Sequence, residues 1–497
     1  MNNAATIVPA PDAEIAALLS KLAVPVTRIT SDSRRVRPGD IFAAYPGTHK
    51  DGRGFIADAI ERGAGAILWD VQGFSWNREW KIPHVPVDNL KARLGSIADR
   101  VYGHPSRELW MVGVTGTNGK TSCAHWIAAG LDAAGRRAAV LGTLGNGLWG
   151  ALDAATHTTP DAAELQELLR GLRARGAVAV AMEVSSHGLD QGRVNGVAFD
   201  LALFTNLSRD HLDYHQTMAA YGAAKARLFA WPGLRVGVVN ADDPFGQSLI
   251  DVARLKGRKI LTYGFGAADI GGARLTAMSS GLAFAVETPW GKGEIYTRLV
   301  GAFNAANLLG VLGILLVSGV ALEAALGFLA NVEAPPGRMQ RLGGDGAPLV
   351  VIDYAHTPDA LDKVLTSLRS AVGAGGELVC VFGCGGDRDR GKRPEMGRVA
   401  ARLANRVIVT SDNPRGEDPD AIVSDIVHGI RDTGNRRYAV ELDRATAIAT
   451  AIGDAKAGDV VLLAGKGHEP YQEHAGVRHP FLDADHATRA LAARSGR

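Results

Sequence analysis

Short apolar runs that end in polar residues recur along the chain, and they predict buried parallel strands. Residues 177–182 and 201–204 are the clearest in the middle of the chain, and residues 349–352, 377–382 and 459–463 repeat the pattern later. Continuous apolar runs of this length are typical of strands covered on both faces by helices. Because ligands of such sheets bind beyond the carboxyl ends of the strands, we expect the functional side chains in the segments that follow these runs.

The strand predicted around residues 109–114 leads into the most informative of these segments, Thr115-Gly-Thr-Asn-Gly-Lys-Thr121. Gly116 and Gly119 allow the backbone to approach an anion, and residues 122–131 read as the following helix. Lys120 is expected to reach the outer phosphates of a nucleotide and Thr121 to coordinate Mg²⁺. The usual phosphate-loop spacing asks for glycine where this chain has Val114, so the match to the general pattern is imperfect. A glycine-rich turn with a stray lysine is the alternative.

Acidic and histidine side chains follow the carboxyl ends of two predicted neighbouring strands. Glu183 follows residues 177–182, and His211 lies just beyond residues 201–204. With Thr121 and Glu183 as oxygen ligands and His211 as the nitrogen candidate, the pattern favours Mg²⁺. His211 and His215 are four residues apart, as in zinc proteases, but Leu212 stands where such a site needs glutamate, which argues against zinc.

The linker at residues 333–340 is rich in proline and separates a last region in which four predicted strands end in charged segments. Arginines in such segments suit a carboxylate, and Asp412, Asn413 and Glu469 suit an ammonium group. Together they predict a site for an amino acid with more than one charged end. A solvated rim with internal salt bridges is the alternative. The cationic cluster comprises Arg388, Arg390, Lys392, Arg393 and Arg415.

The length of 497 residues predicts several domains. We expect three, all of the α/β class: a smaller N-terminal domain at 1–106, a central phosphate-loop domain with a doubly wound sheet at 107–338, and a Rossmann-like domain at 339–497. In the first, the segments 31–34 and 47–53 flank a predicted strand. They are candidates for binding a phosphate or a sugar, although polar surface loops are the more common explanation.

The composition of the chain limits the classes of binding partner and the cellular compartment that we expect. With 54 basic and 52 acidic residues the net charge is +2, which gives no reason to expect nucleic acid or a membrane surface. Three cysteines without zinc spacing favour a reducing compartment, and the first residues lack the pattern of a signal peptide, so a cytoplasmic location is expected. The apolar segment 308–322 is shorter than the roughly 20 residues of a membrane-spanning helix and predicts a buried helix pair broken at Ser318-Gly319.

The motifs together closely resemble the Mur ligase family over essentially the whole chain. The resemblance rests on the phosphate loop, Glu183-Val-Ser-Ser-His187, Asp210-His-Leu-Asp-Tyr-His215, Gly301-Ala-Phe-Asn-Ala-Ala-Asn307, Asp353-Tyr-Ala-His-Thr-Pro358 and Asp412-Asn-Pro-Arg415. The family's own loop also departs from the general phosphate-loop spacing. The form Asp-Asn-Pro-Arg is the one that the family shows when it uses meso-diaminopimelate.

The resemblance also implies roles for individual residues. Lys225, which by itself reads as an ordinary helix lysine facing water, is implied to be carbamylated and to support a second Mg²⁺. The nucleotide-binding positions are Gly116, Thr117, Asn118, Gly119, Lys120, Thr121, Asn304, Arg338 and Asp353. The positions for the UDP-linked substrate are Ser31, Ser33, Thr158, Thr159, Ser185, Gln191 and Arg193. The positions for diaminopimelate are Arg388, Asp412, Asn413, Pro414, Arg415, Gly465 and Glu469.

The implied activity is an ATP-dependent ligation of peptidoglycan synthesis. UDP-N-acetylmuramoyl-L-alanyl-D-glutamate would be activated as an acyl phosphate and then attacked by the amine of meso-diaminopimelate, with Lys120, Glu183, His211 and Lys225 as the catalytic set. The alternatives are an L-lysine-adding or D-alanyl-D-alanine-adding Mur ligase, folylpolyglutamate synthase, or a non-catalytic nucleotide-binding protein. Arg388 and Arg415 argue against the other ligases, and the two metal positions argue against a pure binder.

Overall fold

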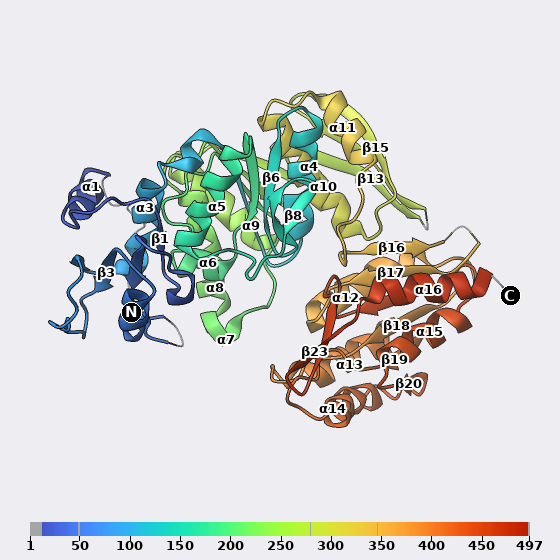
Figure 1. Cartoon of the computed structure of the whole chain (residues 1–497). Helices are drawn as coiled ribbons and strands as arrows, with labels where there is room; N and C mark the ends of the chain where they lie inside the picture. Colours follow the sequence, from blue (N-terminus) through green and yellow to red (C-terminus); the bar gives the residue numbers. More distant parts are fainter. Residues whose placement is uncertain (1–11, 48–49, 279, 345, 496–497) are drawn as a thin grey trace. The chain divides into compact units, whose positions relative to one another are not determined.

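The computed structural model describes residues 12–47, 50–278, 280–344 and 346–495. The chain divides into two compact units. Within the described ranges, the first comprises residues 12–116, 123–207 and 211–262, and the second comprises 117–122, 208–210 and 263–495. Both units are α/β, as predicted (Figure 1). Thr48 and His49, part of the predicted 47–53 segment, lie outside the described residues.

The first unit begins with a four-stranded parallel sheet in the order β1-β2-β3-β4. Apolar side chains of α1 and α3 cover one face, and those of α2 cover the other. The strands are β1 (Ile29–Thr30), β2 (Ile41–Ala44), β3 (Ala66–Asp70) and β4 (His84–Val87), and the helices are α1 (Asp12–Ser20), α2 (Ile56–Glu61) and α3 (Leu90–Val101).

The same unit contains the sheet of the phosphate loop, in which five parallel strands run in the order β11-β10-β5-β9-β6. β7 and β8 extend one edge antiparallel. The strands are β5 (Trp110–Thr115), β6 (Ala138–Gly142), β7 (Gly145–Leu148), β8 (Ala151–Asp153), β9 (Ala179–Glu183), β10 (Leu201–Phe204) and β11 (Val236–Asn240). The helices are α4 (Lys120–Ala133), α5 (Ala162–Ala174), α6 (Ser186–Asp190), α7 (Leu212–His215), α8 (Met218–Ala226) and α9 (Pro244–Leu255).

After β12 (Ile260–Gly264) the second unit continues with an antiparallel meander rather than the strand–helix alternation that we predicted up to residue 338. Side chains of β14 alternate between buried and more exposed positions, because one face of an antiparallel sheet packs on the core and the other meets solvent. The strands are β13 (Ile270–Met278), β14 (Gly281–Thr288) and β15 (Gly291–Thr297). They are followed by the buried helix α10 (Ala302–Val317) and by α11 (Leu322–Ala330), the predicted helix pair. In the described part of the chain, no helix has the length and apolarity needed to span a membrane.

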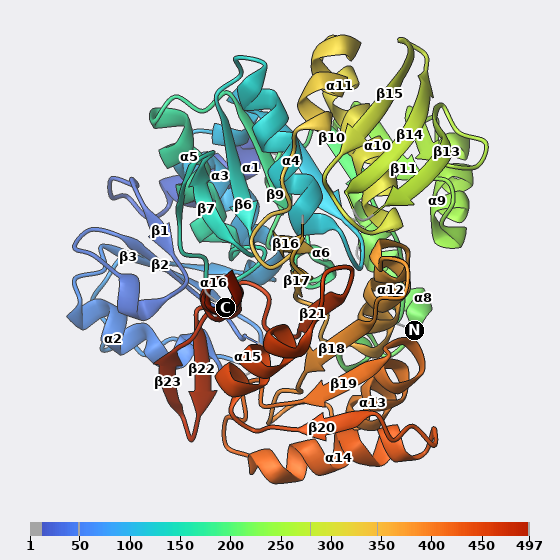
Figure 2. The same ribbon diagram turned by 90° about the vertical axis from the view of Figure 1, so that its right-hand side faces the viewer.

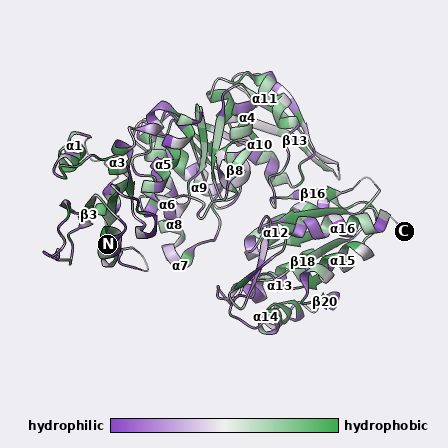
Figure 3. Cartoon of the chain, in the orientation of Figure 1, coloured by the Kyte–Doolittle hydropathy of each residue, from purple (hydrophilic) through white to green (hydrophobic). Residues whose placement is uncertain are grey.

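The second unit ends in a six-stranded sheet of order β16-β17-β21-β18-β19-β20, parallel except for β16 (Figure 2). Its central strands are apolar throughout (Figure 3), and their side chains pack on α12, α13 and α14 at one face and on α15 and α16 at the other. The strands are β16 (Gln340–Gly343), β17 (Leu349–Asp353), β18 (Leu378–Phe382), β19 (Arg406–Val409), β20 (Tyr438–Val440) and β21 (Val460–Ala464). The helices are α12 (Pro358–Leu368), α13 (Lys392–Leu403), α14 (Pro419–Arg431), α15 (Arg444–Asp454) and α16 (Asp483–Ser495), and a hairpin consists of β22 (Tyr471–His474) and β23 (Val477–Pro480).

A fully buried ion pair joins α15 to α16 in this unit. Arg444 donates from Nε to Asp483 Oδ1 at 2.8 Å and from Nη2 to Asp483 Oδ2 at 2.6 Å. The same guanidinium donates to Ser411 O at 3.4 Å and to Ala464 O at 3.1 Å. Ser411 follows β19 and Ala464 ends β21. The Arg444 side chain therefore anchors the beginnings of the two segments that follow these strands, and both segments contain predicted site residues.

Candidate active site

The phosphate loop connects β5 to α4 in the predicted strand–loop–helix order. Gly116 has φ of +150° and Gly119 has φ of +85°, conformations that side-chain-bearing residues rarely adopt. A Cβ at position 116 would lie 1.9 Å from Thr205 Oγ1, so glycine is also required there by space. Lys120 Nζ donates to Thr117 O at 2.8 Å, which folds the lysine back over the loop. A glycine-rich turn that leads into the N-terminus of a helix suits the binding of a phosphate.

Lys225 is buried, and the prediction from residues alone that it faces water is wrong. The side chain extends from α8, is 1% exposed, and donates from Nζ to Gly116 O at 2.7 Å. The ammonium also lies 4.4 Å from the ring centre of Tyr221. Thr217 caps the helix through Ala220 N, which fixes the turn from which the lysine projects. A buried amine is therefore held against the first glycine of the phosphate loop.

The histidines predicted near the metal lie close together but not on one helix face. His211 precedes α7 and has φ of +53°, so His211 and His215 do not form the helical pair of a zinc protease. The His211 ring centre lies 4.8 Å from that of His187, which in turn lies 4.3 Å from Tyr214. Among the described residues, no group of three or more His, Cys, Asp or Glu side chains is arranged to hold a metal. A site that relied partly on phosphate and hydroxyl oxygens would suit Mg²⁺ better than zinc.

Glu183 ends β9 with a fully buried side chain that is held by hydrogen bonds. Thr143 donates to Glu183 Oε1 from its backbone N at 2.7 Å and to Oε2 from its hydroxyl at 3.3 Å. Thr143 Oγ1 also lies 3.0 Å from Thr158 Oγ1, and Thr159 donates from Oγ1 to Glu183 O at 2.8 Å. The carboxylate predicted for Mg²⁺ and the threonines predicted for the UDP-linked substrate thus belong to one cluster. The sequence did not reveal Thr143.

Arg193 completes this cluster. Its guanidinium donates to Gln191 Oε1 at 2.7 and 3.0 Å and to Thr159 O at 3.0 Å. Thr159 Oγ1 lies 3.1 Å from Ser185 Oγ, which caps α6. The predicted substrate positions on the central sheet are therefore brought together by the ends of β9 and α6.

Tyr45 is a second residue that sequence analysis missed. The half-buried ring follows β2, and its hydroxyl shares a hydrogen bond with Ser31. Burial and the nearby Asp161 carboxylate raise the pKa of Tyr45 to about 12, while Arg193 acts in the opposite direction. Ser31 is thus linked through Tyr45 to the Arg193 cluster. Ser33 begins the short 3-10 helix η1 (Ser33–Arg35), and no hydrogen bond joins its side chain to this cluster among the described residues.

The nucleotide positions of the second unit form a separate group. Asn304 donates to Val300 O at 2.8 Å, and Asn307 donates to Asn304 Oδ1 at 3.3 Å. A Cβ on Gly119 would lie 2.8 Å from Asn307 Oδ1, which places this asparagine against the phosphate loop. Asn307 ends the family motif Gly301–Asn307, but it is not among the predicted site residues.

Asp353 and Arg338 lie together at the end of β17. Asp353 accepts from Met339 N and from Ala355 N, both at 2.8 Å, and burial raises the pKa of its carboxyl to about 6 despite the opposing charge of Arg338. The Arg338 guanidinium lies 4.6 Å from the ring centre of Tyr354. This fixed pair of a carboxyl group and a guanidinium suits the polar groups of a ribose or a phosphate.

The cationic cluster of the last domain separates into two kinds of residue. Arg393 is 1% exposed and binds Glu417 at 2.9 Å and Asp425 at 3.0 Å, and Arg390 binds Glu417 at 3.1 Å. Arg393 and the Asp387 backbone lower the pKa of Glu417 to about 2. The alternative of internal salt bridges therefore holds for Arg390 and Arg393. Lys392 instead donates to His356 O at 2.9 Å.

Arg388 and Arg415, the two cations proposed for a carboxylate, both lie next to Gly385. A Cβ at Gly385 would lie 2.8 Å from Arg415 Nη1 and 3.8 Å from Arg388 Cγ. Arg415 donates to Gly386 O at 2.9 Å, and Arg388 donates to Asp387 O at 3.1 Å. Arg415 has φ of +53°, and its backbone is held by the hairpin through Glu473 O at 3.0 Å and Ala475 N at 2.7 Å. Neither guanidinium is neutralised by a carboxylate within the described residues.

Asn413, Asp412, Gly465 and Glu469 meet where β19 and β21 end. Asn413 donates from Nδ2 to Glu469 Oε2 at 2.7 Å. A Cβ on Gly465 would lie 2.5 Å from Asp412 Oδ2, and Gly465 has φ of +107°. The segments after both strands are thus packed closely enough to require glycine.

We expect Gly465→Ala to weaken binding of the amino-acid substrate without weakening binding of ATP. The new methyl group would clash with Asp412. Alanine would also have to adopt the positive φ of Gly465, and this backbone strain costs on the order of 1–3 kcal/mol. In steady-state kinetics, KM for the amino-acid substrate should rise while KM for ATP stays within about twofold. Gly453→Ala is the matched control, because a Cβ there meets nothing within 4 Å. An unchanged KM for the amino acid in Gly465→Ala would contradict the assignment.

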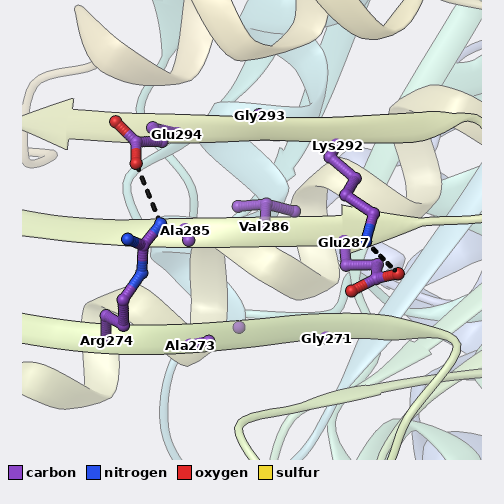
Figure 4. Close-up of a pocket in the computed structure, with 10 residues that line it drawn as sticks. Gly271, Ala273, Arg274, Ala285, Val286, Glu287, Lys292, Gly293 and Glu294 are labelled. Atoms are coloured by element: carbon purple, nitrogen blue, oxygen red, sulfur yellow. Dashed lines mark hydrogen bonds and ion pairs between the residues drawn. The ribbon is translucent and has the colours of Figure 1, made fainter.

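A groove of about 570 Å³ lies on β13, β14 and β15, and none of the predicted site residues lines it (Figure 4). Its floor consists of small residues, and its charged side chains pair with each other: Arg274 with Glu294 at 3.0 Å and Lys292 with Glu287 at 2.8 Å. No group there is left to bind a charged ligand, so the groove is a solvated sheet face.

Comparison with known proteins identifies the family. The description "Mur ligase family, catalytic domain" matches residues 25–102, "Mur ligase middle domain" matches 114–315, and "Mur ligase, glutamate ligase domain" matches 337–467. The UDP-N-acetylmuramoyl-L-alanyl-D-glutamate--2,6-diaminopimelate ligase of Chromobacterium violaceum is 53% identical over 478 residues, 96% of each chain. The protein of that name from Pseudomonas aeruginosa is 51% identical over 470 residues, 94% of this chain and 95% of the other.

Solved structures give the same result. A structure of UDP-N-acetylmuramoyl-L-alanyl-D-glutamate--2,6-diaminopimelate ligase is 40% identical, covers 95% of this chain and 96% of its own, and superposes with a TM-score of 0.70. A MurF ligase from Thermotoga maritima in complex with ADP shares the fold at 18% identity, with 94% and 98% coverage and a TM-score of 0.62. The chain belongs to the Mur ligase family.

Proposed function

We propose that this protein is an ATP-dependent ligase that joins meso-diaminopimelate to the D-glutamate carboxylate of UDP-N-acetylmuramoyl-L-alanyl-D-glutamate. Relatives at about half identity over nearly the full chain bear the name of this activity. The observation that carries the proposal is the composition of the acceptor site: two arginines beside Gly385 for a carboxylate, and the Asn413–Glu469 pair for an ammonium group. L-Lysine lacks the second carboxylate that these arginines would pair with, which penalises it as a substrate.

The residues of the phosphate loop would bind the nucleotide. Gly116 and Gly119 let backbone N–H groups face the phosphates, and Lys120 would stabilise the charge that develops as the γ-phosphoryl group moves to the substrate carboxylate. Mg²⁺, when bound, would supply electrophilic stabilisation of the phosphate oxygens, and Thr121, Glu183, His211 and Lys225 would hold it. The oxygen-rich set fits that ion, and carbamylation would give Lys225 the carboxylate it needs.

The other substrates would lie on the remaining clusters. Ser31, Arg193, Thr158 and Thr159 would orient the UDP-linked dipeptide so that its free carboxylate meets the γ-phosphate. The acyl phosphate would then be attacked by the amine of diaminopimelate, and inorganic phosphate would leave. The three-domain division at residues 106 and 338 remains a prediction that accompanies this assignment.

The test is ADP release measured by a coupled assay with a panel of amino acids. We expect turnover to require the UDP-linked dipeptide and meso-diaminopimelate together. The value of kcat/KM for L-lysine should be lower by roughly 10- to 100-fold or more, because Arg388 and Arg415 would lose the carboxylate that they pair with. Equal turnover with L-lysine would refute the specificity. Preference for D-alanyl-D-alanine or for a folate would assign the protein to another ligase of the superfamily, and nucleotide binding without turnover would indicate a pure binder.

A further inference from the structure

Lys466 is the buried cation of the acceptor site, and none of the roles above requires it. The residue follows Gly465 after β21, and its side chain has no exposed surface. Nζ donates to Tyr471 O at 2.5 Å, to Asn413 Oδ1 at 3.3 Å and to Glu469 Oε2 at 3.3 Å. An ammonium group has three N–H donors, so these three acceptors use its full capacity.

The first of the side chains that Lys466 holds is Asn413. Its Oδ1 accepts from Lys466 Nζ and also from Glu473 N at 2.9 Å. Both donors require the oxygen of the amide at this position, which directs Nδ2 toward Glu469 Oε2 at 2.7 Å. The orientation of the amide therefore depends on the ammonium beside it.

The second side chain that Lys466 holds is Glu469, whose two carboxylate oxygens differ in their hydrogen bonds. Oε2 accepts from Asn413 and from Lys466, whereas no residue within the described ranges donates to Oε1. A carboxylate with one oxygen fixed and the other open presents a single, directed acceptor. Without Lys466, the carboxylate would keep one hydrogen bond and gain rotational freedom.

The third contact of Lys466, with Tyr471 O, connects Asn413 and Glu469 to Arg415, the arginine proposed to bind a carboxylate. Tyr471 begins β22, and Glu473 of the same strand both donates to Asn413 and accepts from Arg415 N. Strand β22 thus fixes the distance between Glu469, which is proposed to bind an ammonium group, and Arg415, which is proposed to bind a carboxylate. A fixed spacing between the two suits a substrate whose two charged ends are a fixed distance apart.

We propose that Lys466 is a positioning residue for the acceptor amino acid: it orients Asn413 and Glu469 so that Glu469 Oε1 receives the substrate ammonium. Lys466 does not itself touch the substrate. This inference rests on the proposed function, because it assumes that Glu469 binds an ammonium group of the amino acid that is ligated.

The test is Lys466→Met in the full-length protein, which keeps the length of the side chain and removes its charge and donors. KM for meso-diaminopimelate should rise roughly 10- to 100-fold, the loss expected for hydrogen bonds to a charged group, while KM for ATP and for the UDP-linked dipeptide stays within about twofold. Lys466→Arg, which keeps the charge, should recover part of the loss.

A matched control separates positioning from general destabilisation. Asp459 precedes the same strand at its other end and accepts from Glu377 N and Lys456 N, both at 2.7 Å. Asp459→Asn should lower the melting temperature of the protein but leave KM for diaminopimelate unchanged. If Asp459→Asn raised this KM as much as Lys466→Met does, the effect of Lys466 would be one of stability only.

A double-mutant cycle with Glu469→Gln provides the decisive measurement. If Lys466 acts through Glu469, Lys466→Met should change KM for diaminopimelate much less in the Glu469→Gln background than in the wild type. Additive effects would overturn the proposal. A wild-type protein that does not ligate diaminopimelate would instead refute the proposed function, so the two failures are distinguishable.

Discussion

Replacing Lys225 by alanine is expected to lower kcat by about 100- to 1,000-fold or more, the cost of removing one preorganised charged group from a transition state. The wild-type amine is buried and lies 2.7 Å from Gly116 O of the phosphate loop. As a carbamate it would place a carboxylate where a second Mg²⁺ is needed, and alanine can supply neither the charge nor the oxygen atoms. ADP release in the coupled assay is the measurement.

Chemical rescue separates the carbamate from the unmodified amine. Acetate or formate should restore part of the activity of Lys225→Ala, because a small carboxylic acid fits the space that the side chain vacates. Lys256→Ala, at an exposed position just after α9, should behave as wild type in both conditions. Full activity of Lys225→Ala without additive would eliminate the carbamate hypothesis. A loss that no carboxylic acid rescues would assign the role to the lysine amine itself.

Arg444→Met is expected to destabilise the second unit by about 3–5 kcal/mol, the range for removing one partner of a buried ion pair. Asp483 would remain fully buried without its partner, and the backbone oxygens of Ser411 and Ala464 would each lose a donor. The measurement is the free energy of unfolding in urea, followed by a signal from the second unit.

Two further variants test the cause. Arg437→Met removes an exposed pair with Glu377 and should cost no more than about 1 kcal/mol. The double variant Arg444→Met, Asp483→Leu removes both buried charges and should recover much of the lost stability. If Arg444→Met were no more costly than Arg437→Met, the pair would not stabilise the domain.

The parallel strands and the phosphate loop could be predicted because the signal for each is local. Apolar runs of four to six residues gave β9, β17, β18 and β21 to within about two residues at each end, and Gly116 and Gly119 have the positive φ angles that their loop requires. The antiparallel strands β13, β14 and β15 were missed, since their alternating pattern contains many glycine and alanine residues and so has little contrast between the two faces.

The residues that organise the candidate site were harder to find, because burial and pairing are properties of the fold. Lys225 has the same local sequence context whether it faces water or Gly116, and only the resemblance to a family marked it. Arg393 and Arg415 are alike in sequence, yet Arg393 is neutralised by Glu417 and Asp425 while Arg415 contacts a backbone oxygen. Thr143 contacts Glu183, and Lys466 contacts Asn413 as well as nearby Glu469 and Tyr471. Contacts between residues distant in the chain, and the link from Tyr45 to Ser31, are not revealed by the sequence pattern.

The hairpin of β22 and β23 has a consequence for the order in which the protein matures during synthesis. Arg415 takes its backbone partners from Glu473 and Ala475, and Arg444 takes its buried partner from Asp483. The phosphate loop, in contrast, has emerged from the ribosome more than 300 residues earlier. A nascent chain can therefore form its nucleotide-binding loop long before its amino-acid site, and the acceptor site first exists once the segment from Glu473 to Asp483 has been translated.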